Sequence, residues 1–120
     1  MPATNDLVNL IGRAKPLTVK EGLNILERDR YRCQYCGLDG MASFENSMVM
    51  TVDFVVPRAA GGKKDARNLV AACRPCNRLK GRRKFKDFEE AKAYVLKRRE
   101  DVRKDWEARM ARLKAHAAAV

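Results

Sequence analysis

The chain has 120 residues, which is enough for one compact domain. Its 26 Lys and Arg residues outnumber 15 Asp and Glu residues and give a formal net charge of +11, and a chain this basic more often binds nucleic acid than an acidic membrane surface. Its apolar runs are too short for a membrane-spanning helix or for the core of a secretory signal, so we expect a cytoplasmic protein.

The N-terminal part of the chain is expected to contain one short helix. Residues 1–17 have the character of an irregular N-terminal arm. Thr18 and Glu21 then have the spacing of a capping box, in which each side chain accepts a backbone N–H at the helix start. An apolar stripe follows, so the sequence predicts a helix from Thr18 to near Arg30.

The middle of the chain has the pattern of two strands and a helix. Apolar side chains occupy alternate positions over residues 48–56, which favours a strand with one buried face. Pro57 ends this strand because proline has no backbone N–H to donate. We expect a returning strand at 69–72 and then a short helix, with Pro75 near its start and Gly81 just past its end.

Residues 87–120 are expected to form a long amphipathic helix and a tail. Asp87 opens the segment with a second capping pattern, and apolar residues recur at intervals of three, four or seven. They are Phe88, Ala91, Val95, Val102, Trp106, Met110 and Leu113. We expect this stripe, Trp106 included, to lie in the core or an interface rather than to stack on bases, and the last residues to fray. Because the helix is long for a small core, part of it is expected to pack on a partner or on a second copy.

Four cysteines fall in two Cys-x-x-Cys pairs, Cys33 with Cys36 and Cys73 with Cys76. Two residues between thiolates let both sulfurs reach one tetrahedral ion at about 2.3 Å, and Gly37 relieves backbone strain after the first pair. Two disulfides would suit an exported protein, and a redox motif would not need a second copy. The spacing therefore favours structural Zn²⁺, which would stabilise the fold and leave no open position for catalysis.

Several motifs between and around these cysteines occur in a fixed order. They are Cys33-x-x-Cys36-Gly37, Thr51-Val52-Asp53-Phe54-Val55-Val56-Pro57-Arg58, Gly61-Gly62, Asn68-Leu69-Val70 and Cys73-Arg74-Pro75-Cys76-Asn77-Arg78-x-Lys80-Gly81. With them, residues 28–83 resemble the HNH endonuclease family. The resemblance implies a ββα-metal core in which two strands and a helix hold one divalent ion. With the N-terminal helix and the long C-terminal helix, this gives an α+β fold class and a nuclease domain at 18–86.

The resemblance also implies roles for individual residues. Asp53 and Asn77 would bind a catalytic Mg²⁺ or Mn²⁺, ions that prefer oxygen ligands, and Asn68 would brace the loop between the strands. The family has a histidine directly after the aspartate, as the general base. This chain has Phe54, which cannot accept a proton but fits an apolar strand face, and the only histidine, His116, lies in the tail. A weakened nuclease, a binding module without catalysis and an engineered substitution all remain open.

A dense basic segment follows the expected metal-binding helix. Residues 74–86 contain Lys and Arg at high density and no acid, and the loop before them adds more. Such charges release counterions from DNA phosphates, so we expect salt-sensitive contact with the DNA backbone and little sequence preference. The candidate DNA-contacting residues are Arg58, Lys63, Lys64, Arg67, Arg78, Lys80, Arg82, Arg83, Lys84 and Lys86.

The resemblance, together with the basic segment, implies an HNH-type, metal-dependent DNA endonuclease that cuts or nicks with little sequence specificity and is attenuated by Phe54. The alternative is a catalytically inactive, zinc-braced DNA-binding module of a phage or bacterial DNA-processing complex. A third option is a purely structural zinc protein. In each case the C-terminal helix is expected to support a homodimer or a larger complex.

Overall fold

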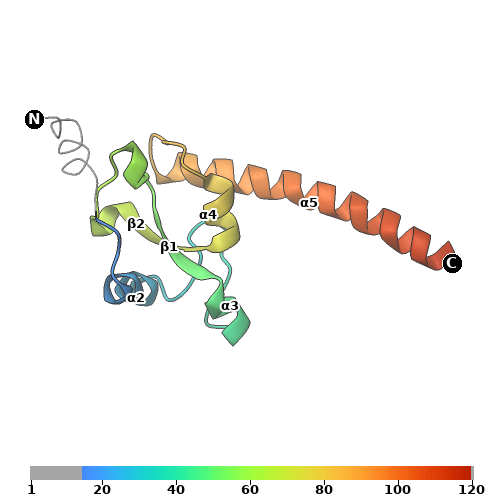
Figure 1. The fold of residues 1–120 in the computed structure, drawn as a ribbon, viewed down its shortest axis with the longest axis horizontal. Coiled ribbons are helices and arrows are strands. Elements are labelled where there is room, and N and C mark those ends of the chain that lie inside the picture. The colour runs from blue at the N-terminus through green and yellow to red at the C-terminus, as the bar shows by residue number, and fades with distance from the viewer. Residues whose placement is uncertain (1–14, 120) are drawn as a thin grey trace, which may run out of the picture.

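The computed structural model describes residues 15–119, so most of the predicted N-terminal arm lies outside the described residues. The helices are α2 (Val19–Arg28), α3 (Phe44–Met48), α4 (Arg74–Lys80) and α5 (Phe88–Ala119). The strands are β1 (Met50–Phe54) and β2 (Leu69–Cys73), and the short 3-10 helices between them are η1 (Arg58–Ala60) and η2 (Ala66–Asn68). Helices beside a two-stranded antiparallel sheet confirm the predicted α+β class (Figure 1).

Helix α2 begins as the sequence predicts. The Thr18 hydroxyl accepts the backbone N–H of Glu21 at 3.2 Å, and the Glu21 carboxylate accepts the backbone N–H of Thr18 at 2.9 Å. The capping box is therefore confirmed. At the other end, the Arg28 guanidinium donates to the Leu69 carbonyl at 2.6 Å, and the Asp29 carboxylate pairs with the same guanidinium. These contacts fix the end of α2 to the start of β2.

Strand β1 is shorter than the strand predicted at 48–56. Its first predicted residue, Met48, instead ends α3, a short helix that the sequence analysis did not predict. The Ser43 hydroxyl caps α3 by accepting the Asn46 N–H at 3.0 Å. β1 pairs antiparallel with β2, with Phe54 opposite Leu69 at the loop end of the ladder.

The two-stranded sheet is covered on both faces, and the predicted single buried face is wrong in part. Met50 is buried as expected, but Asp53 and Val55, which have the opposite parity, are buried as well. Both α2 and α4 pack against the strands. Because neighbouring side chains of a strand point to opposite faces, Asp53 lies on the α4 side while Phe54 lies on the α2 side.

The hydrophobic core is small and contains three of the four cysteines, and the partly buried Cys36 packs against it. Its buried members are Leu26, Cys33, Tyr35, Met50, Ala71, Ala72, Cys73, Cys76, Phe85, Ala91 and Val95. Three of these are cysteines and three are alanines, so the core buries little large aliphatic surface. A core of this size needs an additional stabilising element, which a structural metal ion would supply.

Helix α5 is a single 32-residue helix that runs out from the rest of the chain (Figure 1). At 1.5 Å per residue it is about 48 Å long. Asp87 caps its start, because the carboxylate accepts the Glu90 N–H at 2.9 Å. Within α5 only Ala91 and Val95 are buried, and Trp106, expected in a core or interface, is half exposed. The helix continues to Ala119, so the described part of the tail expected to fray is helical. Among the described residues no helix is both long and apolar enough to cross a membrane.

Candidate functional site

The four cysteines lie close together where the turn at residues 33–37 meets the end of β2 and the start of α4. All four are free thiols, and their Sγ atoms lie within 4.8 Å of one another. The Sγ atoms of Cys36 and Cys73 are 3.7 Å apart. An ion bound tetrahedrally at 2.3 Å would place its sulfur ligands about 3.8 Å from one another. The cluster therefore fits one tetrahedral metal ion, and the disulfide alternative does not match these free thiols.

The local backbone of the first cysteine pair suits metal binding, and the four thiols shift one another's pKa values. The Cys36 N–H points to Cys33 Sγ at 3.5 Å, and Gly37 takes the left-handed conformation, with φ of 80°, that a glycine accepts without strain. Hydrogen bonds from Cys36, Cys73 and Cys76 lower the pKa of Cys33. The hydrogen bond with Cys33 raises the pKa of Cys36, but those with Cys73 and Cys76 bring it down to about 6. Hydrogen bonds with Cys33 and Cys36 raise the pKa of Cys73 and Cys76, so the four thiols share protons and would ionise together only with a bound cation to offset their charge.

Asp53, the predicted ligand of the catalytic ion, is enclosed by two partners. It is 5% exposed, and its Oδ2 accepts the Tyr35 O–H at 2.5 Å. The Lys80 ammonium lies 3.3 Å from Oδ2 and 3.4 Å from Oδ1, and it also donates to the Phe54 carbonyl at 3.0 Å. Lys80 itself is 1% exposed. The three side chains form a buried network of a carboxylate, an ammonium and a phenol.

Burial dominates the acid–base behaviour of this network. Burial raises the pKa of Asp53, although the Tyr35 hydrogen bond and the Lys80 charge both oppose that effect. Burial and the neighbouring Asp53 charge likewise raise the pKa of Tyr35, so its phenol keeps the proton that it donates. Both oxygens of Asp53 are therefore occupied by internal donors.

The residues around Asp53 do not fit a divalent ion in this arrangement. Asn77, the predicted second ligand, lies on α4 one turn before Lys80 and is half-buried. Its carboxamide makes no hydrogen bond to Asp53 or to any other described side chain. A cation is already beside Asp53, and that cation is the Lys80 ammonium. A divalent ion and this ammonium would repel one another at the same carboxylate.

Phe54 does not share a site with Asp53. Its side chain lines a hollow of about 560 Å³ on the α2 side of the sheet, together with Leu26 and Val52. The Arg58 guanidinium lies 6.0 Å from the centre of the Phe54 ring, within the range of a cation–π contact. The apolar interpretation of Phe54 therefore agrees with its position, and residue 54 offers no group that accepts a proton near Asp53.

Asn68 holds the loop between β1 and β2. Its side-chain oxygen accepts the Val56 N–H at 2.8 Å, and its amide donates to the carbonyls of Val56 at 3.1 Å and Lys63 at 3.0 Å. Gly62 packs against the same segment, where a Cβ atom would come 1.7 Å from the Val56 carbonyl oxygen. Gly62 thus permits a close backbone approach, and the side chain of Asn68 joins the two sides of the loop.

The predicted DNA-contacting residues differ in their access to a ligand. The predicted contact of Lys80 with DNA does not agree with its position, because its buried ammonium pairs with Asp53 and cannot reach solvent. Lys64 pairs with Glu21 at 2.9 Å, and the half-buried Arg58 lies beside Phe54. The other predicted contacts are exposed, and they are Lys63, Arg67, Arg78, Arg82, Arg83, Lys84 and Lys86.

Two residues of the Asp53 network were missed by the sequence analysis. Tyr35 lies between Cys33 and Cys36, so the turn that brings those thiols to the cluster also carries its ring into the core. Lys80 belongs to a basic run, which is usually exposed. The signal that would have indicated both is Asp53 itself, because a buried carboxylate requires nearby donors.

Comparison with known proteins agrees with the predicted resemblance. Residues 33–83 match the family model described as HNH endonuclease. The CRISPR-associated endonuclease Cas9 of Corynebacterium diphtheriae is 41% identical over 61 residues, which are 50% of this chain and 5% of that protein. The chain thus spans a small part of this relative's length. No solved structure matches the chain significantly. The resemblance is confirmed for residues 33–83, and it supports a nuclease-type function.

Proposed function

We propose that the segment matching the HNH family, residues 33–83, is a DNA endonuclease domain of attenuated activity. The observation that carries the proposal is the order and packing of β1, β2 and α4 around the cysteine cluster. The contact of Asp53 with α4, the helix that also carries Asn77, supports the proposal. The loop braced by Asn68 adjoins it.

Zn²⁺ is the ion proposed for the cysteine cluster. Four thiolates fill a tetrahedral shell, so the ion would stabilise the fold and would not take part in hydrolysis. The free thiols also suit the cytoplasm, where cysteines stay reduced.

The attenuation has two sources in this proposal. Phe54 cannot act as a general base, and the loss of such a base typically lowers the rate by about 10²–10⁴-fold. In addition, the expected Mg²⁺ or Mn²⁺ would have to displace the Lys80 ammonium from Asp53, so we infer that divalent cations bind weakly. The missing histidine affects the activation of water, and the Lys80 ammonium affects the binding of the metal ion.

DNA is the proposed substrate because exposed Lys and Arg side chains lie between Asp53 and Asn77 and after Asn77 in the sequence, and such side chains bind phosphates. Arg82, Lys84 and Lys86 lie just after α4, and Lys63 and Arg67 lie on the loop before β2. Contacts of this kind are made with phosphates, so little sequence preference is expected. We also expect the uncovered second half of α5 to contact a second copy or a larger complex.

A second candidate function is an inactive DNA-binding module. The specific observation that favours it is the Asp53–Lys80 pair, which satisfies the carboxylate without any metal ion. Both candidates require salt-sensitive DNA binding, so binding alone does not separate them.

Nicking of supercoiled plasmid separates the two candidates. The zinc-loaded full chain is incubated with plasmid and Mn²⁺, beside an Asp53→Asn variant that keeps the shape of the side chain. Slow conversion to open circles that Asp53→Asn abolishes supports the endonuclease. DNA binding with no nicking above the Asp53→Asn background supports the binding module.

A further inference from the structure

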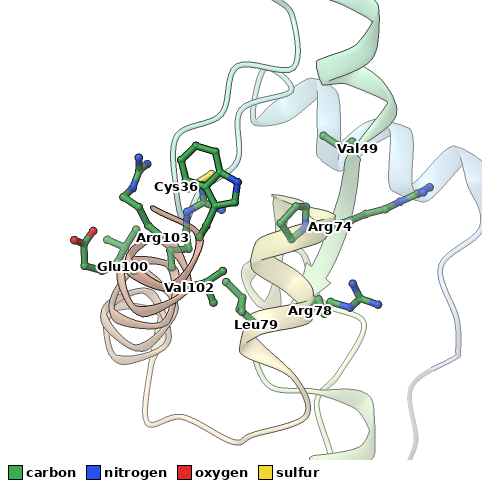
Figure 2. A pocket seen from close by; sticks show the side chains of 12 residues that line it. Cys36, Val49, Arg74, Arg78, Leu79, Glu100, Val102 and Arg103 are labelled. Carbon is green, nitrogen blue, oxygen red and sulfur yellow. The ribbon is translucent and has the colours of Figure 1, made fainter. Parts of the chain in front are cut away.

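A groove separates α4 from α5 on the surface of the molecule. Its volume is about 1240 Å³, and both helices contribute side chains to its lining. Figure 2 shows Leu79 of α4 and Val102 of α5 facing one another across it. Leu96, Pro75 and Trp106 extend the same apolar floor.

The floor of the groove is exposed although it is apolar. Leu96 is 41% exposed, Val102 is 47% exposed and Trp106 is 51% exposed. The stripe of α5 that packs on the domain through Ala91 and Val95 continues directly into these positions. An exposed apolar strip of this kind marks an interaction surface when polar groups border it.

Arginines border the floor on both sides. Arg99 and Arg103 come from α5, and Glu100 is the one carboxylate in the lining. Arg74 and Arg78 come from α4, and their side chains extend along its outer edge, away from α5 (Figure 2). Arg99 contacts the cysteine cluster, because its guanidinium donates to Cys76 Sγ at 3.5 Å. The guanidinium groups of the other three make no hydrogen bond or ion pair with the described residues. The border is thus complementary to an anion.

We propose that this groove binds a single-stranded segment of nucleic acid. Unpaired bases would lie against Trp106 and the apolar floor, and the phosphates would contact Arg74, Arg78 and Arg103. Aromatic side chains and a cationic border are the combination that single strands bind, because every base has a face that stacks. A duplex would not fill the groove, because its bases are stacked on one another and their faces are hidden.

The charge outside the groove favours nucleic acid over an acidic peptide. Arg82, Lys84 and Lys86 continue the positive surface beyond the end of α4. A partner that matches both the groove and this extension carries negative charge at regular intervals over a longer path, as a phosphate backbone does. The proposal rests on the proposed function in one respect, namely that the partner is nucleic acid.

Trp106 is the single tryptophan of the chain, so its fluorescence reports directly on the groove. The zinc-loaded full chain is titrated with a fluorescein-labelled oligothymidine, without added Mg²⁺, and anisotropy and tryptophan emission are followed together. We expect quenching of Trp106 that follows the anisotropy. We also expect roughly tenfold weaker binding for Trp106→Ala, the loss associated with one stacked base.

Two double variants with the same loss of charge, one inside the groove and one outside it, test whether oligothymidine contacts the groove. Replacement of both Arg78 and Arg103 by Gln should weaken oligothymidine binding about tenfold. Replacement of both Arg109 and Arg112, exposed on α5 outside the groove, removes the same charge and should have a much smaller effect. Circular dichroism checks that each variant remains folded.

Three outcomes would overturn the proposal. The first is oligothymidine binding that leaves Trp106 emission unchanged, and the second is an equal loss of affinity in both double variants. The third is tighter binding of an amphipathic acidic peptide than of oligothymidine, which would assign the groove to a protein partner. Duplex binding and plasmid nicking that persist in any of these cases would leave the proposed function standing, whereas a chain that binds no DNA would contradict both.

Discussion

The Lys80 ammonium lies 3.3 Å from Asp53 Oδ2, and both side chains are buried. A carboxylate that the HNH resemblance assigns to a divalent ion is therefore neutralised by a cation of the same chain. Breaking a buried pair by removing one partner leaves the other charge uncompensated, which is strongly destabilising. The pair is consequently part of the fold as well as part of the candidate site.

Replacement of Lys80 by Met should show whether the Lys80 ammonium competes with a divalent ion for Asp53. Without added metal, the variant should lose about 3–5 kcal/mol of unfolding free energy because Asp53 remains buried without its partner. Added Mn²⁺ should recover part of that loss, since a ligand that binds only the folded state stabilises it. Urea unfolding with and without Mn²⁺ measures both effects. The exposed Lys84→Met variant is the control, and an equal Mn²⁺ effect in wild type and Lys80→Met would show that Lys80 does not compete.

Tyr35→Phe should test the phenol that donates to Asp53. The change keeps the ring, which packs against Phe88 with centroids 5.2 Å apart, and removes the hydrogen bond. A loss of about 1–3 kcal/mol is expected from a buried charged acceptor that loses a donor. Tyr94→Phe is the matched control, because that ring also packs in an aromatic pair and its hydroxyl makes no hydrogen bond to the described residues. Equal unfolding free energies for the two variants would contradict the role given to Tyr35.

Removal of metal from the cysteine cluster should unfold the domain. The core is small, and binding of a structural ion contributes directly to folding. Treatment with a strong zinc chelator should release one ion per chain, measured with a colorimetric zinc dye, and should abolish the cooperative thermal transition. Cys73→Ser should behave like the chelated protein. An unchanged transition after complete release of the metal would contradict a structural role.

Glu21 should contribute a pH-dependent part of the stability. The backbone hydrogen bond from Thr18, with help from Lys64, lowers the pKa of Glu21 from 4.5 to about 2. Because the folded pKa is the lower one, this contribution is complete above pH 4.5 and disappears as the pH falls toward 2. Glu21→Gln should therefore unfold more easily than wild type at pH 6, and the difference should vanish near pH 2. A difference that is the same at both pH values would contradict the assignment.

The sequence predicted those features that depend on local rules. The capping box of α2 and the two thiols of each Cys-x-x-Cys pair follow from residues close together in the chain, whose spacing limits where the side chains go. The order of β1, β2 and α4 followed from Pro57, Pro75 and Gly81, which restrict the backbone wherever they occur.

The features that could not be predicted depend on distant contacts. Asp53 and Lys80 are 27 residues apart, and nothing near Lys80 distinguishes it from the exposed cations around it. The burial of Asp53 depends on Tyr35 and on Lys80 of α4, which cover the second face of the sheet, and an alternating pattern in one strand does not report such contacts. The single-face expectation at 48–56 failed for that reason.

Plasmid nicking by a double variant, Lys80→Met with Phe54→His, tests the central claim most directly. Lys80→Met frees the carboxylate, and a histidine at 54, the last residue of β1, has to turn from the hollow on the α2 side to the Asp53 side of the sheet to act as the general base. With Mn²⁺ we expect the double variant to nick at least about 100-fold faster than Lys80→Met alone, because it adds a general base, and also faster than Phe54→His alone, because its carboxylate is free to bind the ion. A double variant that is folded, binds Mn²⁺ and nicks no faster than the single variants would contradict the claim that an HNH site lies at Asp53.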